Sequence, residues 1–410
     1  MKEVLAVLDS QEALPMLWRA SLSDDANERQ QFIAAAEHCH AHNVRFPNSL
    51  DEVQMLQSLG DSAFARYLLG CFWYSKRRYD EAVSCWRETL EKSPDYAPAH
   101  RLLGVYSWNK QQDATQALAY LQRAVALEPD NARFLFELDF LQKLLARPVH
   151  ERLTTLVERK AVVLKRDDLT AELLSLWNAS GHYADAAAIL DTRVFHPWEG
   201  GEGKITGQYL LNQLHRALQF IERGAFKQAT DCLKAALRYP DNLGEGRLPG
   251  QTDNDIWYLL GYCAEQAGDA QQAAEYYQLA RQGGSTLDAG RYYNDQPADY
   301  LFWQGIALRK SGNPAQAEQH FRHFIDWAAQ HRDDVPQVDF FAVSLPDLVV
   351  LDVSAQQRHL QHCLFIEALG HLGLGNVSAC QQRMQQLLQI NPAHDKAHLI
   401  RHALQSGIFS

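Results

Sequence analysis

The chain lacks long apolar segments, an excess of positive charge and closely spaced cysteine pairs. No run of about 18 apolar residues occurs among its 410 residues, so we expect no membrane-spanning helix. It has 39 Lys and Arg residues against 50 Asp and Glu residues, which gives a formal net charge of -11. Nucleic acids and anionic lipids bind positively charged surfaces, so we expect neither as a partner.

Cysteine usage points away from disulfides and cofactors. The seven cysteines are scattered, and no Cys-x-x-Cys pair occurs. We expect them to be buried thiols that pack as small apolar side chains, in a protein of the reducing cytoplasm. His38 and His42 share a helix face, but no third ligand accompanies them, so the sequence predicts no metal site and no cofactor.

What the sequence does contain is an internal repeat. Ala229, Ala273 and Ala317 are 44 residues apart, and each lies between an upstream glycine and a bulky residue four positions downstream. This pattern resembles the second helix of the tetratricopeptide repeat, a pair of antiparallel helices of about 34 residues. Glycine and alanine let the two helices approach closely, and the bulky residue fills the gap. The resemblance implies an all-α fold, a right-handed α-solenoid of helix-turn-helix repeats with extended loops between them.

The repeat pattern divides the chain into five predicted segments. These are divergent N-terminal helices over 1–62, two repeat units over 63–131, a degenerate helical pair over 132–166, repeats with long inserts over 167–394, and a C-terminal capping helix and tail over 395–410. A solenoid end needs a polar outer face for solubility, and we therefore expect the polar last helix to cap the array.

Four inserts follow second helices of the repeats, at 196–206, 240–253, 282–297 and 332–358. Equivalent loops of a solenoid project on one side, so we expect a common surface. The first three inserts combine aromatic residues, glycine, carboxylates and at least one cation. The candidate ligand-binding residues are Trp198, Lys204, Arg247, Arg291, Tyr292 and Tyr293, and the candidate carboxylates are Glu199, Glu202, Glu245 and Asp295. The fourth insert holds an apolar stretch, 340–351, that is expected to be extended.

Two interpretations of the inserts remain open. Aromatic faces can stack on sugar rings while carboxylates accept hydroxyl hydrogen bonds, and two carboxylates can act as acid and base in glycoside chemistry. Alternatively, glycines form turns, aromatics fill repeat interfaces and carboxylates cap helices; Asp255 and Asp299, just before predicted first helices, are expected as caps. Convergence of three inserts on one pocket favours a sugar site, whereas dispersal over an exposed rim favours a scaffold.

The concave face of the predicted first helices is a second candidate site. The residues expected to line it are Tyr67, Tyr74, Arg101, Trp108, Tyr258, Tyr262, Phe302 and Arg309. An aromatic groove favours an apolar or helical peptide, or a protein domain. The sequence therefore favours a non-catalytic interaction scaffold that binds a protein domain or peptide through this groove and the inserts. The alternative is a carbohydrate-binding or glycoside-processing component.

Three insert motifs carry a narrower resemblance. They are His-Pro-Trp-Glu-Gly-Gly-Glu-Gly at 196–203, Asn-Leu-Gly-Glu-Gly at 242–246 and Tyr-Tyr-Asn-Asp at 292–295. They resemble the C-terminal tetratricopeptide half of large uncharacterised bacterial proteins, in which a β-rich, carbohydrate-related domain precedes the array. The resemblance implies either the C-terminal part of such a protein or a stand-alone relative, with the inserts near a sugar site.

Overall fold

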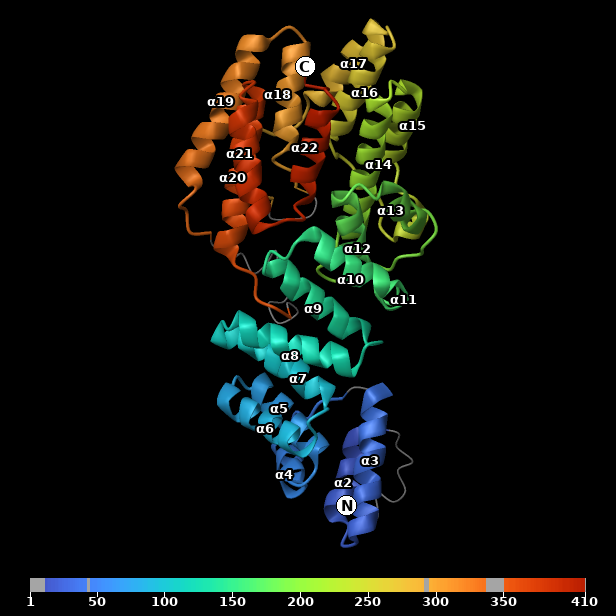
Figure 1. Cartoon of the computed structure of the whole chain (residues 1–410), viewed down its shortest axis with the longest axis vertical. Coiled ribbons are helices and arrows are strands. Elements are labelled where there is room, and N and C mark those ends of the chain that lie inside the picture. Colours follow the sequence, from blue (N-terminus) through green and yellow to red (C-terminus); the bar gives the residue numbers. More distant parts are fainter. Residues whose placement is uncertain (1–11, 43–44, 291–294, 337–349, 410) are drawn as a thin grey trace. The chain divides into compact units, whose positions relative to one another are not determined.

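The computed structural model describes residues 12–42, 45–290, 295–336 and 350–409, and within these ranges every regular element is a helix (Figure 1). This confirms the predicted all-α class. The chain forms two compact units, Met1–Leu138 (unit 1) and Asp139–Ser410 (unit 2). None of the described helices is long and apolar enough to cross a membrane.

Unit 1 consists mainly of helix pairs, in which α2 packs on α3, α5 on α6 and α7 on α8. Its helices are α2 (Ala13–Leu22), α3 (Ala26–His42), α4 (Leu50–Ser58), α5 (Ala63–Ser75), α6 (Tyr79–Lys92), α7 (Ala97–Tyr106), the π-helix η1 (Ser107–Gln111) and α8 (Ala114–Leu127). Helix α9 (Ala132–Leu144) crosses the boundary between the units.

Unit 2 continues the same construction, with α14 packed on α15, α16 on α17, α18 on α19 and α20 on α21. Its helices are α10 (Val149–Glu158), α11 (Lys160–Val163), α12 (Asp167–Ala179), α13 (Tyr183–Leu190), α14 (Lys204–Glu222), α15 (Phe226–Ala236), the 3-10 turn η2 (Asp241–Leu243), α16 (Asn254–Gln266), α17 (Ala270–Ala280), α18 (Tyr300–Lys310), α19 (Pro314–His331), α20 (Ala355–Gly373), α21 (Val377–Ile390) and α22 (Asp395–Gln405).

A close contact between glycine and a bulky residue joins the helices of four of these pairs, as the repeat pattern predicts. A Cβ atom added at Gly261 of α16 would lie 2.6 Å from the ring of Tyr277 on α17. The same added atom at Gly305 of α18 would lie 2.6 Å from the ring of Phe321 on α19. In unit 1, Gly70 lies against Trp86 and Gly104 against Leu121 in the same way. Only glycine permits this approach, so the sequence spacing sets the distance between the paired helices.

The last helix, α22, which the sequence predicts to be a polar end cap, packs on earlier helices of unit 2. It packs on α12 and α14, where the Asp395 carboxylate accepts hydrogen bonds from Ser175 (2.7 Å) and Gln208 (2.7 Å) (Figure 1). Beyond its end, the Ile408 carbonyl accepts a hydrogen bond from the Tyr258 hydroxyl at 3.1 Å. The physical reason is that α22 carries a buried apolar face and that its polar groups find partners on other helices. That apolar face consists of Ala397, Leu399, Ile400 and Ala403.

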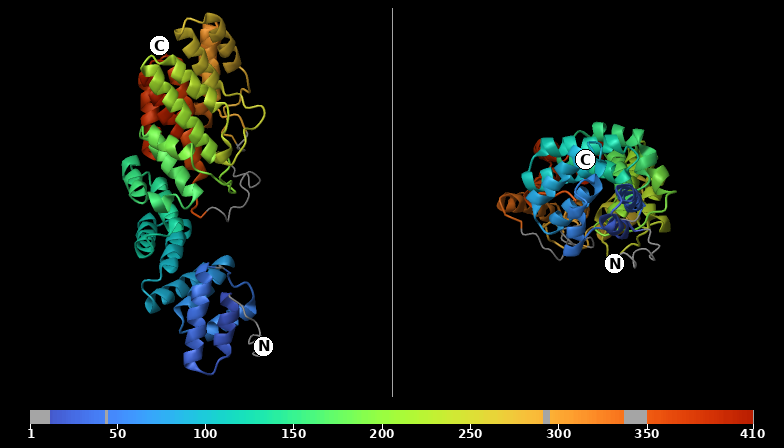
Figure 2. Two further views of the ribbon diagram at one scale, coloured as in Figure 1. Left: turned by 90° about the vertical axis from the view of Figure 1, so that its right-hand side faces the viewer. Right: turned by 90° about the horizontal axis from the view of Figure 1, so that it is seen from below.

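The loops that follow α15 and α17 lie together on one side of unit 2 (Figure 2). The residue directly before the first insert contacts the loop after α15, because the Phe195 amide donates to the Asn242 carbonyl at 2.8 Å. Helix α14 begins at Lys204, inside the stretch predicted as the first insert. Most of the extended stretch predicted within 332–358 lies outside the described residues.

Candidate functional site

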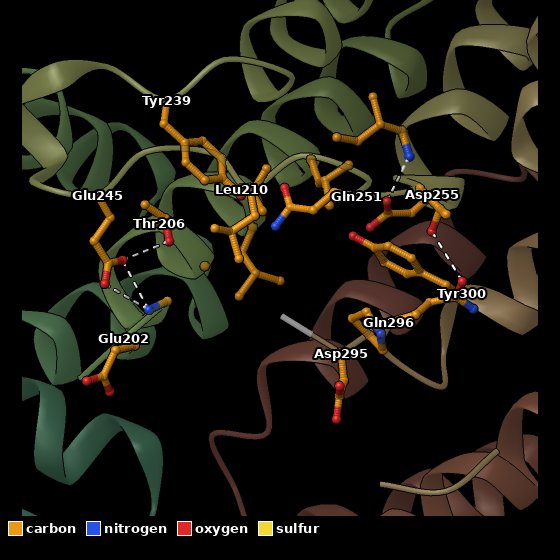
Figure 3. A pocket seen from close by; sticks show the side chains of 18 of the residues that line it. Glu202, Thr206, Leu210, Tyr239, Glu245, Gln251, Asp255, Asp295, Gln296 and Tyr300 are labelled. Atoms are coloured by element: carbon orange, nitrogen blue, oxygen red, sulfur yellow. Dashed lines mark hydrogen bonds between the residues drawn. The ribbon is translucent and has the colours of Figure 1, made fainter. Parts of the chain in front are cut away.

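Three inserts of unit 2 meet around a cavity of about 520 Å³, which we call the insert cavity (Figure 3). The first insert contributes the segment that leads into α14, the second contributes the loop between α15 and α16, and the third contributes the segment before α18. The lining residues are Glu202, Gly203, Thr206, Gly207, Leu210, Leu211, Leu214, Tyr239, Glu245, Gly246, Leu248, Gly250, Gln251, Thr252, Asp255, Ile256, Asp295, Gln296, Pro297, Tyr300 and Lys396.

At one end of the cavity, Glu245 caps the start of α14. Its carboxylate accepts hydrogen bonds from the Gly203 amide at 3.1 and 3.0 Å and from the Thr206 hydroxyl at 3.2 Å. The first amides of a helix have no partner within the helix, and a carboxylate there also complements the helix dipole. Glu245 therefore ties the second insert to the first and holds this end of the cavity in place.

The middle of the cavity is apolar. Leu210, Leu211 and Leu214 follow one another at helical spacing on α14, and Ile256 of α16 adjoins them in the lining. Figure 3 shows Leu210 between the Glu245 end and the Tyr300 end. An apolar strip of this kind suits the C–H faces of a small ligand, while polar groups at the ends fix its orientation.

The opposite end holds a charge cluster in which a half-buried Lys396 faces two buried aspartates. Its ammonium group lies 3.1 Å from Asp299, 3.8 Å from Asp255 and 5.4 Å from the centre of the Tyr300 ring. The prediction that the two aspartates cap helices holds only for the position of Asp299. Asp299 does occupy the N-cap position of α18 but makes no side-chain cap hydrogen bond, and the N-cap residue of α16 is Asp253, not Asp255. Both carboxylates face the lysine because burial favours pairing with an opposite charge.

Burial and pairing together set the ionisation of this cluster. Burial raises the pKa of the Asp255 carboxyl, and Lys396 partly offsets that effect. Burial opposes the charge of Lys396, but Asp299 and Asp255 outweigh it and raise the pKa of the ammonium group. Burial, followed by the two nearby carboxylates, raises the pKa of the Tyr300 phenol well above its ordinary value, so the hydroxyl remains a hydrogen-bond donor at neutral pH.

The predicted carboxylates take different positions. Glu202 and Asp295 are exposed lining residues, and Figure 3 shows their carboxylates at the edge of the cavity. Glu245 lines the cavity but is engaged with α14. Glu199 is exposed and is absent from the lining.

The predicted aromatic and basic residues of the inserts stabilise the loops themselves. A Cβ atom added at Gly201 would lie 2.0 Å from the Trp198 indole, so the tryptophan folds over its own loop. The Lys204 amine lies 5.9 Å from the centre of that indole ring. Arg247 forms an ion pair with Asp253. Arg291, Tyr292 and Tyr293 lie outside the described residues.

Several residues predicted to line a concave groove are part of the core. Tyr67, Tyr258 and Phe302 are 6%, 2% and 0% exposed. In unit 2 the C-terminal segment covers this face, because the Phe409 ring lies 5.4 Å from Phe302 and Ile408 accepts the Tyr258 hydrogen bond. These aromatic side chains pack the array together and are not presented to a partner.

The other predicted groove residues have partners within the chain or lie in the π-helix. Tyr74 packs on Trp86, and Arg101 forms a two-pronged ion pair with Glu137 at 2.6 Å. Arg309 hydrogen-bonds the Gly373 carbonyl. Tyr262 is half-buried, and Trp108 lies in η1.

Sequence reasoning missed Lys396 and Tyr300 as site residues. Lys396 belongs to the helix predicted to cap the array, and Tyr300 is the first residue of α18, directly after the third insert. The sequence did hold one signal for Tyr300, because this residue lies only three positions after the third predicted insert. No local signal placed Lys396 beside it, because their contact spans most of the C-terminal half of unit 2.

The tetratricopeptide repeat family matches residues 73–132 and 214–290 of the chain. Among solved structures, the chain is similar to PilW, described as a widely conserved type IV pilus biogenesis factor, with 16% identity over 53% of this chain and 90% of that one, and a TM-score of 0.28. It is also similar to a chain of the Naa15/Naa10 complex bound to HypK-THB, with 13% identity over 96% and 61% of the two chains and a TM-score of 0.38. A third is the apo quorum sensor NprR from B. thuringiensis, with 12% identity over 92% and 97% and a TM-score of 0.33. The family match over these two stretches and the paired helices agree: the described residues form an all-helical array that contains tetratricopeptide repeats.

Proposed function

We propose that this chain is a non-catalytic binding module whose insert cavity holds a small polyhydroxylated ligand of the carbohydrate type. The observation that supports this most is the meeting of three separate inserts around one cavity. A purely connecting role for the inserts requires no such convergence. The narrower sequence resemblance to repeat halves of carbohydrate-related bacterial proteins agrees with the proposal.

The chemistry of the walls suits a polyol. A sugar hydroxyl both donates and accepts hydrogen bonds, and the cavity offers donors at Tyr300 and Lys396 beside acceptors at Asp255 and Gln251. The apolar strip of α14 suits the C–H face of a sugar ring. A volume of about 520 Å³ lies within the range of roughly 300–1,000 Å³ that is typical of small-molecule sites.

Binding is favoured over glycoside hydrolysis. Hydrolysis needs two carboxyl groups that flank the scissile bond, one to donate a proton and one to act as nucleophile or base. Glu245 is occupied by the start of α14, while Glu202 and Asp295 lie at the edge of the cavity. The fourth lining carboxylate, Asp255, faces Lys396 at 3.8 Å, so we assign the four carboxylates to binding and to loop structure.

A second function, docking of a protein domain or peptide, has a specific basis in unit 1. A hollow of about 440 Å³ surrounds the turn between α5 and α6 and the π-helix, lined by Arg77, Arg78, Tyr79, Asp80, Glu81, Tyr106 and Lys110. π-Helical turns are frequent at functional sites, and tyrosine and arginine are enriched in protein interfaces. We propose this hollow as the scaffold surface of a cytoplasmic protein, in place of the buried aromatic groove.

A thermal-shift screen of the full chain against neutral sugars, amino sugars and sugar acids tests the cavity proposal. Ligands that bind only the folded state raise the melting temperature. Gly207 of α14 lines the cavity, and no atom lies within 4 Å of a Cβ atom added there. Gly207→Leu should therefore fill the cavity without disturbing the helix.

The matched control is Gln271→Leu, which adds the same side chain at an exposed position of α17 outside the cavity. We expect a shift of several degrees for at least one sugar with the wild type and with Gln271→Leu, and no shift with Gly207→Leu. A shift that persists in Gly207→Leu would place the ligand elsewhere. No shift with any sugar would refute the proposal.

A further inference from the structure

We propose that the insert cavity selects sugars without negative charge, and that the cluster of Tyr300, Asp255 and Lys396 hydrogen-bonds neighbouring hydroxyl groups of the ligand. This inference rests on the proposed carbohydrate function and adds the class of sugar and the end of the cavity that recognises it.

The charge of the lining supports exclusion of anions. Among the described residues, four carboxyl side chains and one amine line the cavity, which gives these residues a formal charge of -3: the carboxyl groups are Glu202, Glu245, Asp255 and Asp295, and the amine is Lys396. The single cation is already shared between Asp255 and Asp299 at 3.8 and 3.1 Å. A uronic acid or sugar phosphate would thus bring its charge next to a described lining that is negative and holds no uncommitted cation, and like charges at close range are strongly unfavourable.

The arrangement of the Lys396 end supports recognition of hydroxyl groups. Tyr300 reaches from the edge toward the middle of the cavity beside Asp255 (Figure 3). The Asp255 carboxylate accepts a hydrogen bond from the Ile256 amide at 2.9 Å, which fixes its orientation. A donor and an acceptor are therefore held side by side on rigid helix starts. Adjacent hydroxyl groups of a sugar can satisfy both, one as acceptor and one as donor.

This cluster is also set apart from the helix-capping carboxylate at the other end. Glu245 is used by α14, whereas the Tyr300 and Lys396 groups come from α18 and α22. The groups that recognise the ligand thus come from helices of the array, and the mouth of the cavity is formed by the inserts.

Matched sugar trios test the selectivity. Each trio consists of a neutral hexose, its 2-amino derivative and its uronic acid, so that the ring and most hydroxyl groups stay constant while the charge changes. Trios based on glucose, galactose and mannose cover the common stereochemistries. For the trio that binds, we expect the uronic acid to bind at least about tenfold more weakly than the neutral hexose, and the amino sugar at least as tightly as the hexose.

Two pairs of variants test which lining residues cause the discrimination against the uronic acid and the binding of the neutral hexose. Glu202→Gln removes one exposed charge of the lining and should reduce discrimination against the uronic acid by roughly twofold or more, whereas Glu199→Gln, an exposed residue outside the lining, should leave it unchanged. Tyr300→Phe removes only a hydroxyl and should weaken binding of the neutral hexose roughly three- to tenfold. Tyr276→Phe, outside the cavity, should have no effect.

The outcomes separate the two proposals. If no sugar of any trio binds, the carbohydrate function fails and this inference fails with it. If a uronic acid binds more tightly than its neutral partner, or if Tyr300→Phe binds the hexose as well as the wild type, the inference is overturned while the carbohydrate function stands. Weaker uronic acid binding together with the loss in Tyr300→Phe supports both.

Discussion

Replacing Gly261 by alanine tests the close helix contact on which the repeat array depends. The new methyl group would lie 2.6 and 2.7 Å from two carbon atoms of the Tyr277 ring, whereas carbon atoms in ordinary contact are about 3.5–4.0 Å apart. The two helices would have to separate by about 1 Å, and overpacking of this kind costs roughly 1–3 kcal/mol. Alanine also favours the helix over glycine by about 1 kcal/mol, which opposes that cost.

Gly207→Ala is the matched control, because Gly207 also lies within a helix of unit 2 but has no atom within 4 Å of an added Cβ. The gain in helix propensity is common to both variants and cancels in their comparison. We expect Gly261→Ala to be less stable than Gly207→Ala by about 1–3 kcal/mol. Urea denaturation of the full chain measures the difference, and hydrogen exchange of amides in α16 and α17 shows whether it is local. Equal stability of the two variants would refute the packing account.

Three further predictions concern buried groups of unit 2. Arg152 donates two hydrogen bonds to the Asp139 carboxylate, at 2.9 and 2.7 Å, and both side chains are 2% exposed. Arg152→Met should therefore lower the free energy of unfolding by about 3–5 kcal/mol, as measured by urea denaturation. The control Arg322→Met, which breaks an exposed ion pair, should lower it by at most about 1 kcal/mol. Burial lowers the pKa of His394 to about 4, so this histidine takes up a proton first in the unfolded chain, below about pH 6.5, and its own contribution should lower stability by about 1.4 kcal/mol per pH unit between these values. His394→Asn, which keeps a helix-capping side chain, should remove this contribution to the pH dependence, whereas substitution of the exposed His182 should not. Phe409→Ala removes ring contacts with α18 and should destabilise the C-terminal segment by about 1–3 kcal/mol. Hydrogen exchange of amides in α22 should become faster. Unchanged exchange would contradict the role of Phe409 in covering the aromatic side chains of α18.

The sequence was sufficient for the helix pairs because their packing rule is local. Gly261 and Tyr277 are 16 positions apart and belong to one repeat, so spacing alone predicts their contact. No such local rule predicts where α22 packs. Asp395 meets Ser175 and Gln208, which are far away along the chain, and a helix with this many polar residues is equally consistent with an exposed cap.

The candidate site could be predicted only in part for the same reason. Insert composition indicated a common surface, and the inserts do meet at one cavity. Local sequence could not tell that Asp255 and Asp299 face Lys396, because an aspartate at the start of a helix is also typical of a cap. It likewise could not assign Glu245 to the start of α14, since that contact joins two different inserts.

Hydrogen exchange of the full chain with and without saturating sugar from the screen is the most direct test of the insert cavity as the ligand site. The account predicts slower exchange at amides of 203–207 and 245–256, which surround the cavity, and no change within 45–138 of unit 1. Protection that appears in unit 1, or binding that leaves the amides around the cavity unchanged, would contradict it.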